Sequence, residues 1–488
     1  MRAISRRRAL LLGGLGAAAT VAGGAGLWWT ATSRFSPEAG GGFAEPEELR
    51  STDGQLNVRL EASPVSVPLG GLQASILGYN GGVPGPTLRV RGGDTLQIEL
   101  VNNLGVPTNL HVHGLHVSPQ GNGDNVFVMV PPGQSFSYEH RLPADHPSGT
   151  YWYHPHHHGM VADQVSAGLF GAIIVEEEDA PAVSRERILV VSDITLDGSG
   201  ALAEATPMDR MLGREGRLVL VNGHSNPELS ARPGERERWR IVNTCVARYL
   251  RLRLDGQQWE LLGIDLARFP TPQTVDEVLL APGNRADVLV TATAGVSALR
   301  TSYYNRGSMA GMMGRAARGP DGTGDLVLAT FSVSGTPATA PPASPPMPAR
   351  PAPEDLRNAV VAARRQLTLA TGTGMGMGMG MMSFTINGRT FDPDRTDTVV
   401  AAGTVEEWTL LNPSPMDHPF HLHVWPMQVV EEAGTAPDSA TWRDVVNIPA
   451  NGQVKVRISF TGFTGRSVYH CHILDHEDQG MMGVIDVR

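Results

Sequence analysis

A stretch near the end of the chain places one cysteine among closely spaced histidines: Tyr469-His470-Cys471-His472-Ile473-Leu474-Asp475-His476-Glu477-Asp478-Gln479-Gly480-Met481-Met482. The residues before it and the β-branched Ile473 favour a strand, in which successive side chains point to opposite faces. His470 and His472 would then share one face, and Cys471 would lie on the other. A thiolate between two imidazoles in this arrangement can connect two metal sites through only a few covalent bonds.

His476 and Met481 follow Cys471 within one predicted loop. Two imidazoles, one thiolate and a weak axial methionine form the ligand set of a blue-copper electron-transfer site, so one imidazole is still missing here. The alternative is a buried structural cysteine beside scattered histidines. Several potential ligands in so short a segment favour the metal site.

The composition narrows the classes of protein to consider. A length of 488 residues predicts about three domains. The net charge of -10 argues against a nucleic-acid partner, because a phosphate backbone is bound by a basic surface. The 57 glycines and 36 prolines are typical of many short strands joined by turns. If Cys471 binds a metal, Cys245 has no disulfide partner and is expected to be a small buried residue.

The N-terminus carries Arg6-Arg7-Arg8, followed by a Gly- and Ala-rich apolar run that ends at Trp29. This pattern predicts an export signal of the twin-arginine type, which we extend with a flexible segment to residues 1–45. The apolar run is about long enough to span a bilayer. Its weak hydrophobicity favours a signal over an anchor, and we expect a periplasmic, extracellular or cell-surface protein.

Short alternating runs of apolar and polar residues predict three β-sandwich domains at residues 46–179, 182–334 and 358–488. The acidic cluster Glu176 to Asp179 ends the first domain, and we interpret it as a solvated linker. Residues 335–357 are rich in Pro and Ala and predict a second linker. The middle domain contains one histidine, His224, so we expect it to have a structural and positioning role.

Three His-x-His pairs lie upstream of Cys471. The first two, His111 with His113 and His154 with His156, fall in the first predicted domain, and packing alone does not readily explain both. The third, His421 with His423, lies in the third domain and is preceded by His418, which supplies the imidazole that the cysteine site lacks. On a strand, the two imidazoles of such a pair lie about 7 Å apart on one face, which suits neighbouring metal ions.

Methionines alternate with glycines between Gly374 and Met382, and a similar stretch runs from Ser308 to Gly314. Methionine usually fills hydrophobic cores, but a core strand with so many glycines would be weak. We interpret these stretches as mobile loops whose thioethers suit Cu(I), with a flexible filler or an apolar contact surface as the alternatives. The candidate substrate-copper ligands are Met375, Met377, Met379, Met381, Met416 and Asp417.

The four histidine clusters resemble the copper motifs of the multicopper oxidases, a family that includes laccases and bacterial cuprous oxidases. The resemblance extends from about Glu48 to Arg488 and implies an all-β protein of three cupredoxin-like Greek-key β-sandwich or barrel domains. It also implies four coppers per chain: a type 1 copper on His418, Cys471, His476 and Met481; a type 2 copper on His111 and His421; and two type 3 coppers, one on His113, His154 and His472 and one on His156, His423 and His470. The type 2 and type 3 coppers would form one cluster between the first and third domains.

The resemblance also implies the activity. Substrate would be oxidised by one electron at the type 1 copper, Cys471 would connect this site to the cluster through His470 and His472, and four electrons would reduce O₂ to two waters. Asp124 and Glu477 match the positions of acidic residues that deliver protons in the family. A turn-forming residue or a surface charge is the alternative for each of them.

We favour Cu(I) as the substrate, because the methionine-rich stretches resemble those of cuprous oxidases and because Met416 and Asp417 directly precede His418. A laccase that oxidises phenols or aromatic amines is the nearest alternative. Outside the enzymes, a copper carrier or storage protein needs fewer clustered imidazoles, and a descendant that has lost copper is expected to lack some ligands. Copper content distinguishes these classes. A monomer is our default expectation.

Overall fold

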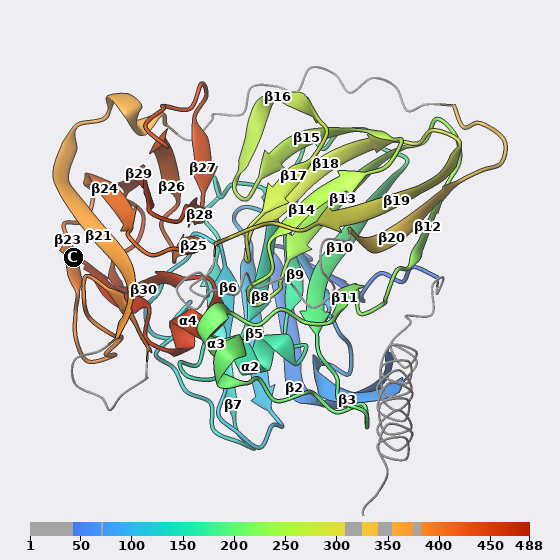
Figure 1. Cartoon of the computed structure of the whole chain (residues 1–488). Helices are drawn as coiled ribbons and strands as arrows, with labels where there is room; N and C mark the ends of the chain where they lie inside the picture. The colour runs from blue at the N-terminus through green and yellow to red at the C-terminus, as the bar shows by residue number, and fades with distance from the viewer. Residues whose placement is uncertain (1–41, 70–71, 308–324, 340–353, 374–381) are drawn as a thin grey trace, which may run out of the picture.

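The computed structural model describes residues 42–69, 72–307, 325–339, 354–373 and 382–488, and its strands form six sheets. Each of three successive parts of the chain contributes two sheets, so the predicted all-β class is confirmed (Figure 1). The middle part includes the short helix α3 (Pro207–Leu212), and two more short helices, α2 (Val161–Ser166) and α4 (Leu474–Asp478), belong to the first and third parts. None of the described helices is long and apolar enough to cross a membrane.

Domain 1 consists of two sheets with the following strand orders. The first sheet is β1 (Glu48–Arg50), β4 (Thr87–Val90), β9 (Gly171–Val175), β8 (Gly149–His154) and β6 (His111–His113), and the second is β3 (Leu72–Tyr79), β2 (Gln55–Leu69), β5 (Thr95–Asn102) and β7 (Ser135–Arg141). In β2, alternate residues from Leu56 to Ala62 are buried, as expected for a strand with one face on the core.

Domain 2 has the same two-layer arrangement. One sheet is β11 (Leu218–Val221), β10 (Arg185–Ile194), β13 (Arg236–Asn243), β18 (Arg285–Thr291), β15 (Gln258–Ile264) and β16 (Ala267–Val275), and the other is β12 (Glu228–Ala231), β20 (Leu326–Val333), β19 (Gly295–Ser302), β14 (Leu250–Leu254) and β17 (Val278–Leu280).

Domain 3 begins with the 3-10 turn η2 (Leu356–Asn358). One of its sheets is β22 (Met382–Ile386), β21 (Val361–Thr373), β24 (Val405–Asn412), β29 (Gly452–Ser459), β26 (Met427–Glu432) and β27 (Thr441–Arg443), and the other is β23 (Thr398–Val400), β31 (Met482–Val487), β30 (Gly465–Cys471), β25 (His418–Leu422) and β28 (Val445–Ile448). A long parallel strand pair recurs in all three domains, as β2 with β5, β10 with β13 and β21 with β24.

One of the hydrophobic cores contains residues from all three domains. It includes Trp152 from domain 1, Val190 and Val246 from domain 2, and Trp408 and Cys471 from domain 3. The helices α2, α3 and α4 lie together beside this junction (Figure 1). The domains are therefore packed as one body around the region that carries the candidate ligands.

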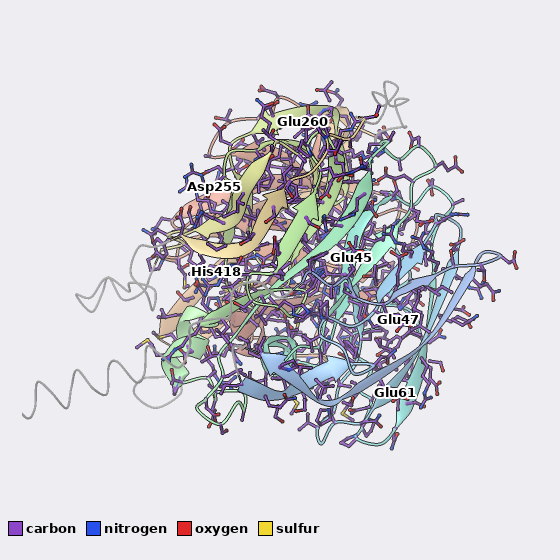
Figure 2. All side chains as sticks on the ribbon, turned by 90° about the vertical axis from the view of Figure 1, so that its right-hand side faces the viewer. Glu45, Glu47, Glu61, Asp255, Glu260 and His418 are labelled. Atoms are coloured by element: carbon purple, nitrogen blue, oxygen red, sulfur yellow. The ribbon has the colours of Figure 1, made fainter. Side chains whose placement is uncertain are left out.

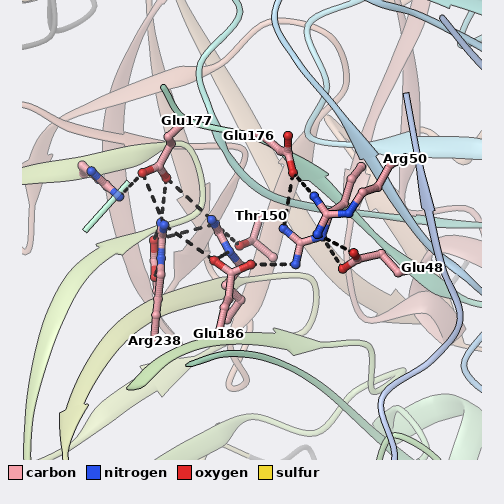
Figure 3. Close-up of polar contacts among 11 residues, drawn as sticks. Glu48, Arg50, Thr150, Glu176, Glu177, Glu186 and Arg238 are labelled. Atoms are coloured by element: carbon pink, nitrogen blue, oxygen red, sulfur yellow. Dashed lines mark hydrogen bonds and ion pairs between the residues drawn. The ribbon is translucent and has the colours of Figure 1, made fainter. Parts of the chain in front are cut away.

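The acidic cluster after β9 is not the solvated linker that we predicted. The side chain of Glu177 is 1% exposed and accepts a hydrogen bond from Arg238 of domain 2 at 2.6 Å, and it also pairs with Arg268. Glu176 pairs with Arg50 at 2.5 Å (Figure 3). A buried carboxylate is tolerated when cations compensate its charge, and the arginines lie far from Glu177 in the sequence. The prediction was wrong because it considered only the local run of charge.

Two of the predicted domain boundaries also differ from those in the structure. The carbonyl of Ala44 accepts a hydrogen bond from Asn222 at 3.2 Å, and the guanidinium of Arg187 lies 5.5 Å from the centre of the Phe43 ring. Leu356 is buried, and its carbonyl accepts a hydrogen bond from Arg457 at 2.7 Å. Packing on domain 2 thus begins before residue 45, and packing in domain 3 begins before residue 358.

Candidate copper centres

Strand pairing brings the candidate ligands together. In domain 1, β6 pairs with β8 so that His111 lies opposite His154. In domain 3, β25 pairs with β30 so that His421 lies opposite His470. All ten candidate imidazoles and Cys471 are buried, whereas acidic side chains such as Asp255 lie on the outside of the molecule (Figure 2). Antiparallel register thus juxtaposes histidines from separate sequence motifs.

Cys471 forms the centre of the first group. Its Sγ lies 3.5 Å from Nδ1 of His418 and 3.8 Å from Nδ1 of His476. Met481 is fully buried in the same core, and its backbone carbonyl accepts a hydrogen bond from the Cys471 N–H. Burial raises the pKa of the Cys471 thiol well above its usual range. A nearby metal cation would offset this effect and stabilise the thiolate.

Both imidazoles of this group direct a lone pair at the sulfur. Nε2 of His476 lies 3.2 Å from the carbonyl of Met211, which can only accept, so this nitrogen carries the proton. Nε2 of His418 lies 2.9 Å from Oγ of Ser414, whose own proton is donated to Asn412 at 2.6 Å. In both rings Nδ1 is left as the free acceptor, which is the form that binds a metal.

Eight imidazoles form the second group, between domains 1 and 3. Nε2 of His470 lies 3.1 Å from Nε2 of His156 and 3.2 Å from Nε2 of His423. Nε2 of His111 lies 3.4 Å from Nε2 of His421. Ring nitrogens that converge in this way suit a shared cation.

The remaining three imidazoles of this group, His113, His154 and His472, have ring centres 5.0 to 5.9 Å apart. Within the described residues, Nδ1 of His113, Nε2 of His154 and both nitrogens of His472 lack a hydrogen-bond partner. An unpaired buried polar atom costs free energy, and a bound metal removes that cost. The residues present therefore fit copper.

Desolvation keeps these imidazoles neutral. Burial lowers the pKa of His418 and of His154 to about 3 and that of His470 to about 4. The backbone carbonyl of Asp444 accepts from Nδ1 of His421 at 2.7 Å, and that of Pro155 accepts from Nδ1 of His154 at 2.8 Å. These contacts leave Nε2 of both rings free to bind a metal.

The two acids expected to deliver protons are buried beside the second group. Asp124 lies 2.9 Å from Nδ1 of His111, and burial raises its pKa to about 7. Glu477 lies 3.1 Å from Nδ1 of His470 and 3.6 Å from Nδ1 of His156, and burial raises its pKa well above the usual range. The alternative of a surface charge does not apply to either residue.

Arg285 and Asp444 contact the candidate ligands, and the sequence did not predict either of them. Arg285, from domain 2, donates two hydrogen bonds of 2.6 Å to the carboxylate of Asp444. The same carboxylate lies 3.0 Å from Nε2 of His113, and Nδ1 of that ring has no hydrogen-bond partner among the described residues. Arg285 is the first residue of β18 and Asp444 lies between β27 and β28, and neither has a recognisable spacing to any histidine, so no signal in the chain identified them.

The structure places two of the predicted substrate-copper ligands inside the protein. Met416 is buried in the core of domain 3. Asp417 is also buried, and its carboxylate accepts hydrogen bonds from Tyr304 at 2.8 Å, Asn447 at 3.0 Å and the Ala450 N–H at 2.9 Å. A carboxylate engaged in this way is not available at the surface, so we do not retain this pair. The four predicted loop ligands, Met375, Met377, Met379 and Met381, lie outside the described residues.

We predict that Arg285→Leu weakens copper binding at the histidine cluster, by about ten- to hundredfold in affinity, because Asp444 no longer holds the ring of His113. Arg285→Lys should restore part of this loss, since lysine keeps the charge but not the planar pair of donors. Copper content and electron paramagnetic resonance of the purified protein measure the effect.

Arg187→Leu is the matched control. Arg187 is an equally buried arginine of domain 2 and binds Glu237 at 2.7 and 2.9 Å, so its loss destabilises the same domain without touching a candidate ligand. The control should retain its copper. Equal copper loss in both variants would show that Arg285 acts only through overall stability.

Known proteins provide an independent comparison. Three sequence profiles described as multicopper oxidase match residues 62–180, 152–324 and 363–488. The multicopper oxidase mco of Staphylococcus haemolyticus is 29% identical over 433 residues, which cover 85% of this chain and 84% of that protein. The cell division protein FtsP of a Rahnella species is also 29% identical, with coverage of 90% and 91%.

The solved structure of a Campylobacter jejuni multicopper oxidase, described as a metallo-oxidase, is 30% identical and superimposes with a TM-score of 0.80 over 93% of this chain and 96% of that chain. The likeness covers nearly the whole of both proteins, and the buried imidazoles and Cys471 fit copper. The chain therefore belongs to the multicopper oxidases, copper-binding oxidoreductases that couple the oxidation of a reducing substrate to the reduction of O₂.

Proposed function

We propose that this multicopper oxidase holds four coppers and oxidises Cu(I) to Cu(II) with O₂ as the electron acceptor. The proposal rests mainly on the grouping of ten buried imidazoles with Cys471. In one cycle, four Cu(I) ions lose one electron each, and one O₂ takes up four electrons and four protons to form two waters. When bound, the resident coppers supply the one-electron redox chemistry and the site of O₂ reduction.

The proposed ligand sets follow the family assignment. The type 1 copper takes His418, Cys471, His476 and Met481; the type 2 copper takes His111 and His421; one type 3 copper takes His113, His154 and His472; and the other takes His156, His423 and His470. Contacts of 3.1 to 3.4 Å between ring nitrogens support the second and fourth sets. His111 also lies within ligand distance of His113 and His154, and of His421 with His423, so distance alone does not divide the cluster.

The protein groups around the ligands have separate roles. Asp124 holds the ring of His111, and Glu477 lies beside the rings of His156 and His470. We propose these two acids as proton donors, because they are buried next to the site where O₂ accepts protons. Their position on the Nδ1 side of the rings leaves Nε2 free for copper.

Two observations support Cu(I) as the substrate. Methionines alternate with glycines from 374 to 382, and thioethers are soft ligands suited to Cu(I). The Campylobacter jejuni relative is described as a metallo-oxidase. A laccase that oxidises phenols remains the second candidate, because the family also accepts organic substrates.

Copper content provides the first test. We expect about four coppers per chain and an intense blue colour that Cys471→Ser abolishes while the cluster keeps about three coppers, since only the cysteine sulfur produces that colour. Cys245→Ser is the matched control, because Cys245 is the other buried thiol and contacts the carbonyl of Val191. One copper per chain would support a carrier, and none would support a copper-free protein, a class to consider given the likeness to cell division proteins.

Initial O₂ uptake tests the substrate. We expect faster uptake with Cu(I) than with a dimethoxyphenol, and we expect deletion of residues 374–381 to slow Cu(I) oxidation selectively because it removes candidate thioether ligands. A variant with the loop methionines changed to leucine keeps the loop length and serves as a control for the deletion. Faster phenol turnover together with unchanged Cu(I) oxidation would identify a laccase.

We also propose export by the twin-arginine route to the periplasm or cell surface, with the protein acting as a monomer. The arginine cluster and the apolar run that follows support this location. Changing Arg6, Arg7 and Arg8 to lysine should retain the protein in the cytoplasm, as measured by cell fractionation, whereas Arg2→Lys should not. Normal export of the triple variant would contradict this route.

A further inference from the structure

The imidazoles of His418 and His476, on either side of Cys471, each form a hydrogen bond through Nε2. One bond goes to a buried residue of domain 3 and the other to a partly buried helix of domain 2. On one side, Nε2 of His418 bonds to Ser414, which is 4% exposed and bonds onward to Asn412 and to the carbonyl of Met416. These partners are all buried in domain 3. Among the described residues, this side offers a substrate no surface contact with the group around Cys471, which we call the cysteine centre.

On the other side, Nε2 of His476 donates to the backbone carbonyl of Met211 at 3.2 Å. Met211 lies in α3 of domain 2 and is only partly buried, and Met208, one turn earlier in α3, is 50% exposed. In Figure 1, α3 lies beside α4, which carries His476. The helix α3 therefore connects His476 with the protein surface.

The helix α3 is firmly attached to α4. Gln479 donates to the carbonyl of Arg210 at 2.8 Å, and Arg214 donates to the carboxylate of Asp475 at 2.6 Å. Gly213 ends the helix with a φ of 79°, and a Cβ there would lie 2.5 Å from Ile473, so the chain can approach this closely only with glycine. These contacts fix the position of α3 relative to His476.

Met208 and Met211 are three residues apart and therefore neighbours on one face of the helix. Met208 is exposed, Met211 is partly buried against the core that contains Cys471, and a thioether is a soft ligand suited to Cu(I). The positive charges nearby are compensated by carboxylates: Arg210 pairs with Asp163 at 3.2 Å, Arg214 with Asp475 at 2.6 Å and Arg306 with Glu215 at 3.3 Å. A monovalent cation therefore meets little net repulsion.

We propose that Met208 and Met211 form a docking site for the substrate Cu(I) ion and that electrons reach the cysteine centre from α3. This inference rests on the proposed function. The docked ion loses one electron, for which O₂ is the final acceptor, and becomes Cu(II); His476 is the candidate ligand that contacts α3, and no atom is transferred. Cu(II) prefers nitrogen and oxygen ligands to thioethers, so the product leaves. Four such events, with four protons, reduce one O₂ to two waters.

Binding of Ag(I), which is not oxidised under these conditions, tests the docking site in the copper-loaded full chain. All variants are made with Met375, Met377, Met379 and Met381 changed to leucine, so that loop thioethers do not mask the result. The double change of Met208 and Met211 to leucine should weaken Ag(I) binding and raise the KM for Cu(I) about tenfold with little change in kcat. Met-to-Leu changes conserve volume and retain the Met211 carbonyl, so the fold should persist.

Met129→Leu is the matched control, because Met129 is 56% exposed and belongs to domain 1. If the double variant binds Ag(I) and oxidises Cu(I) normally, the docking site on α3 is wrong. The proposal that Cu(I) is the substrate would still stand. Absence of Cu(I) oxidation in the unaltered chain would overturn the proposed substrate and, with it, the donation of electrons through α3. Loss of Ag(I) binding together with a raised KM in the double variant only would support the inference.

Discussion

The carboxylate of Asp444 is the point at which all three domains meet beside the histidine cluster. It belongs to domain 3, receives two hydrogen bonds from Arg285 of domain 2 and lies 3.0 Å from His113 of domain 1. Arg285 also donates to the carbonyl of Thr150 in domain 1 at 2.9 Å. Separating a buried ion pair leaves an uncompensated charge at a cost of about 3–5 kcal/mol, so the placement of the domains and the orientation of the His113 ring depend on each other.

Burial has opposite effects on the ligands and on the acids beside them. It lowers the pKa of each imidazole, so that lone pairs remain available, and it raises the pKa of Asp124 and Glu477, so that both acids more readily hold a proton. Crowded neutral imidazoles without partners destabilise the folded chain. Copper should therefore stabilise the assembled domains as well as supply the chemistry, because it binds only where the domains are correctly placed.

The sequence was informative where a local repeat determines geometry. The two-residue period of a strand predicted that His470 and His472 face away from Cys471, and the rings and the sulfur indeed contact different partners. Long-range partners left no such pattern: Asp444 is 331 residues from His113 and 159 from Arg285. Burial of Glu177 likewise depends on arginines of another domain, and burial of Met416 depends on packing that spacing does not reveal.

Domain 2 contributes none of the proposed ligands of the four resident coppers, yet its described residues contact both copper centres. At the cluster it acts through the side chain of Arg285, which few substitutions can replace, because both donors and the charge are used. At the cysteine centre, α3 contacts His476 through the backbone carbonyl of Met211, which any residue except one that breaks the helix can supply. Side chains on α3 can therefore change without altering a ligand. The contact of Arg285 constrains the cluster where O₂ is reduced. The surface of α3, in contrast, can change to suit a different electron donor.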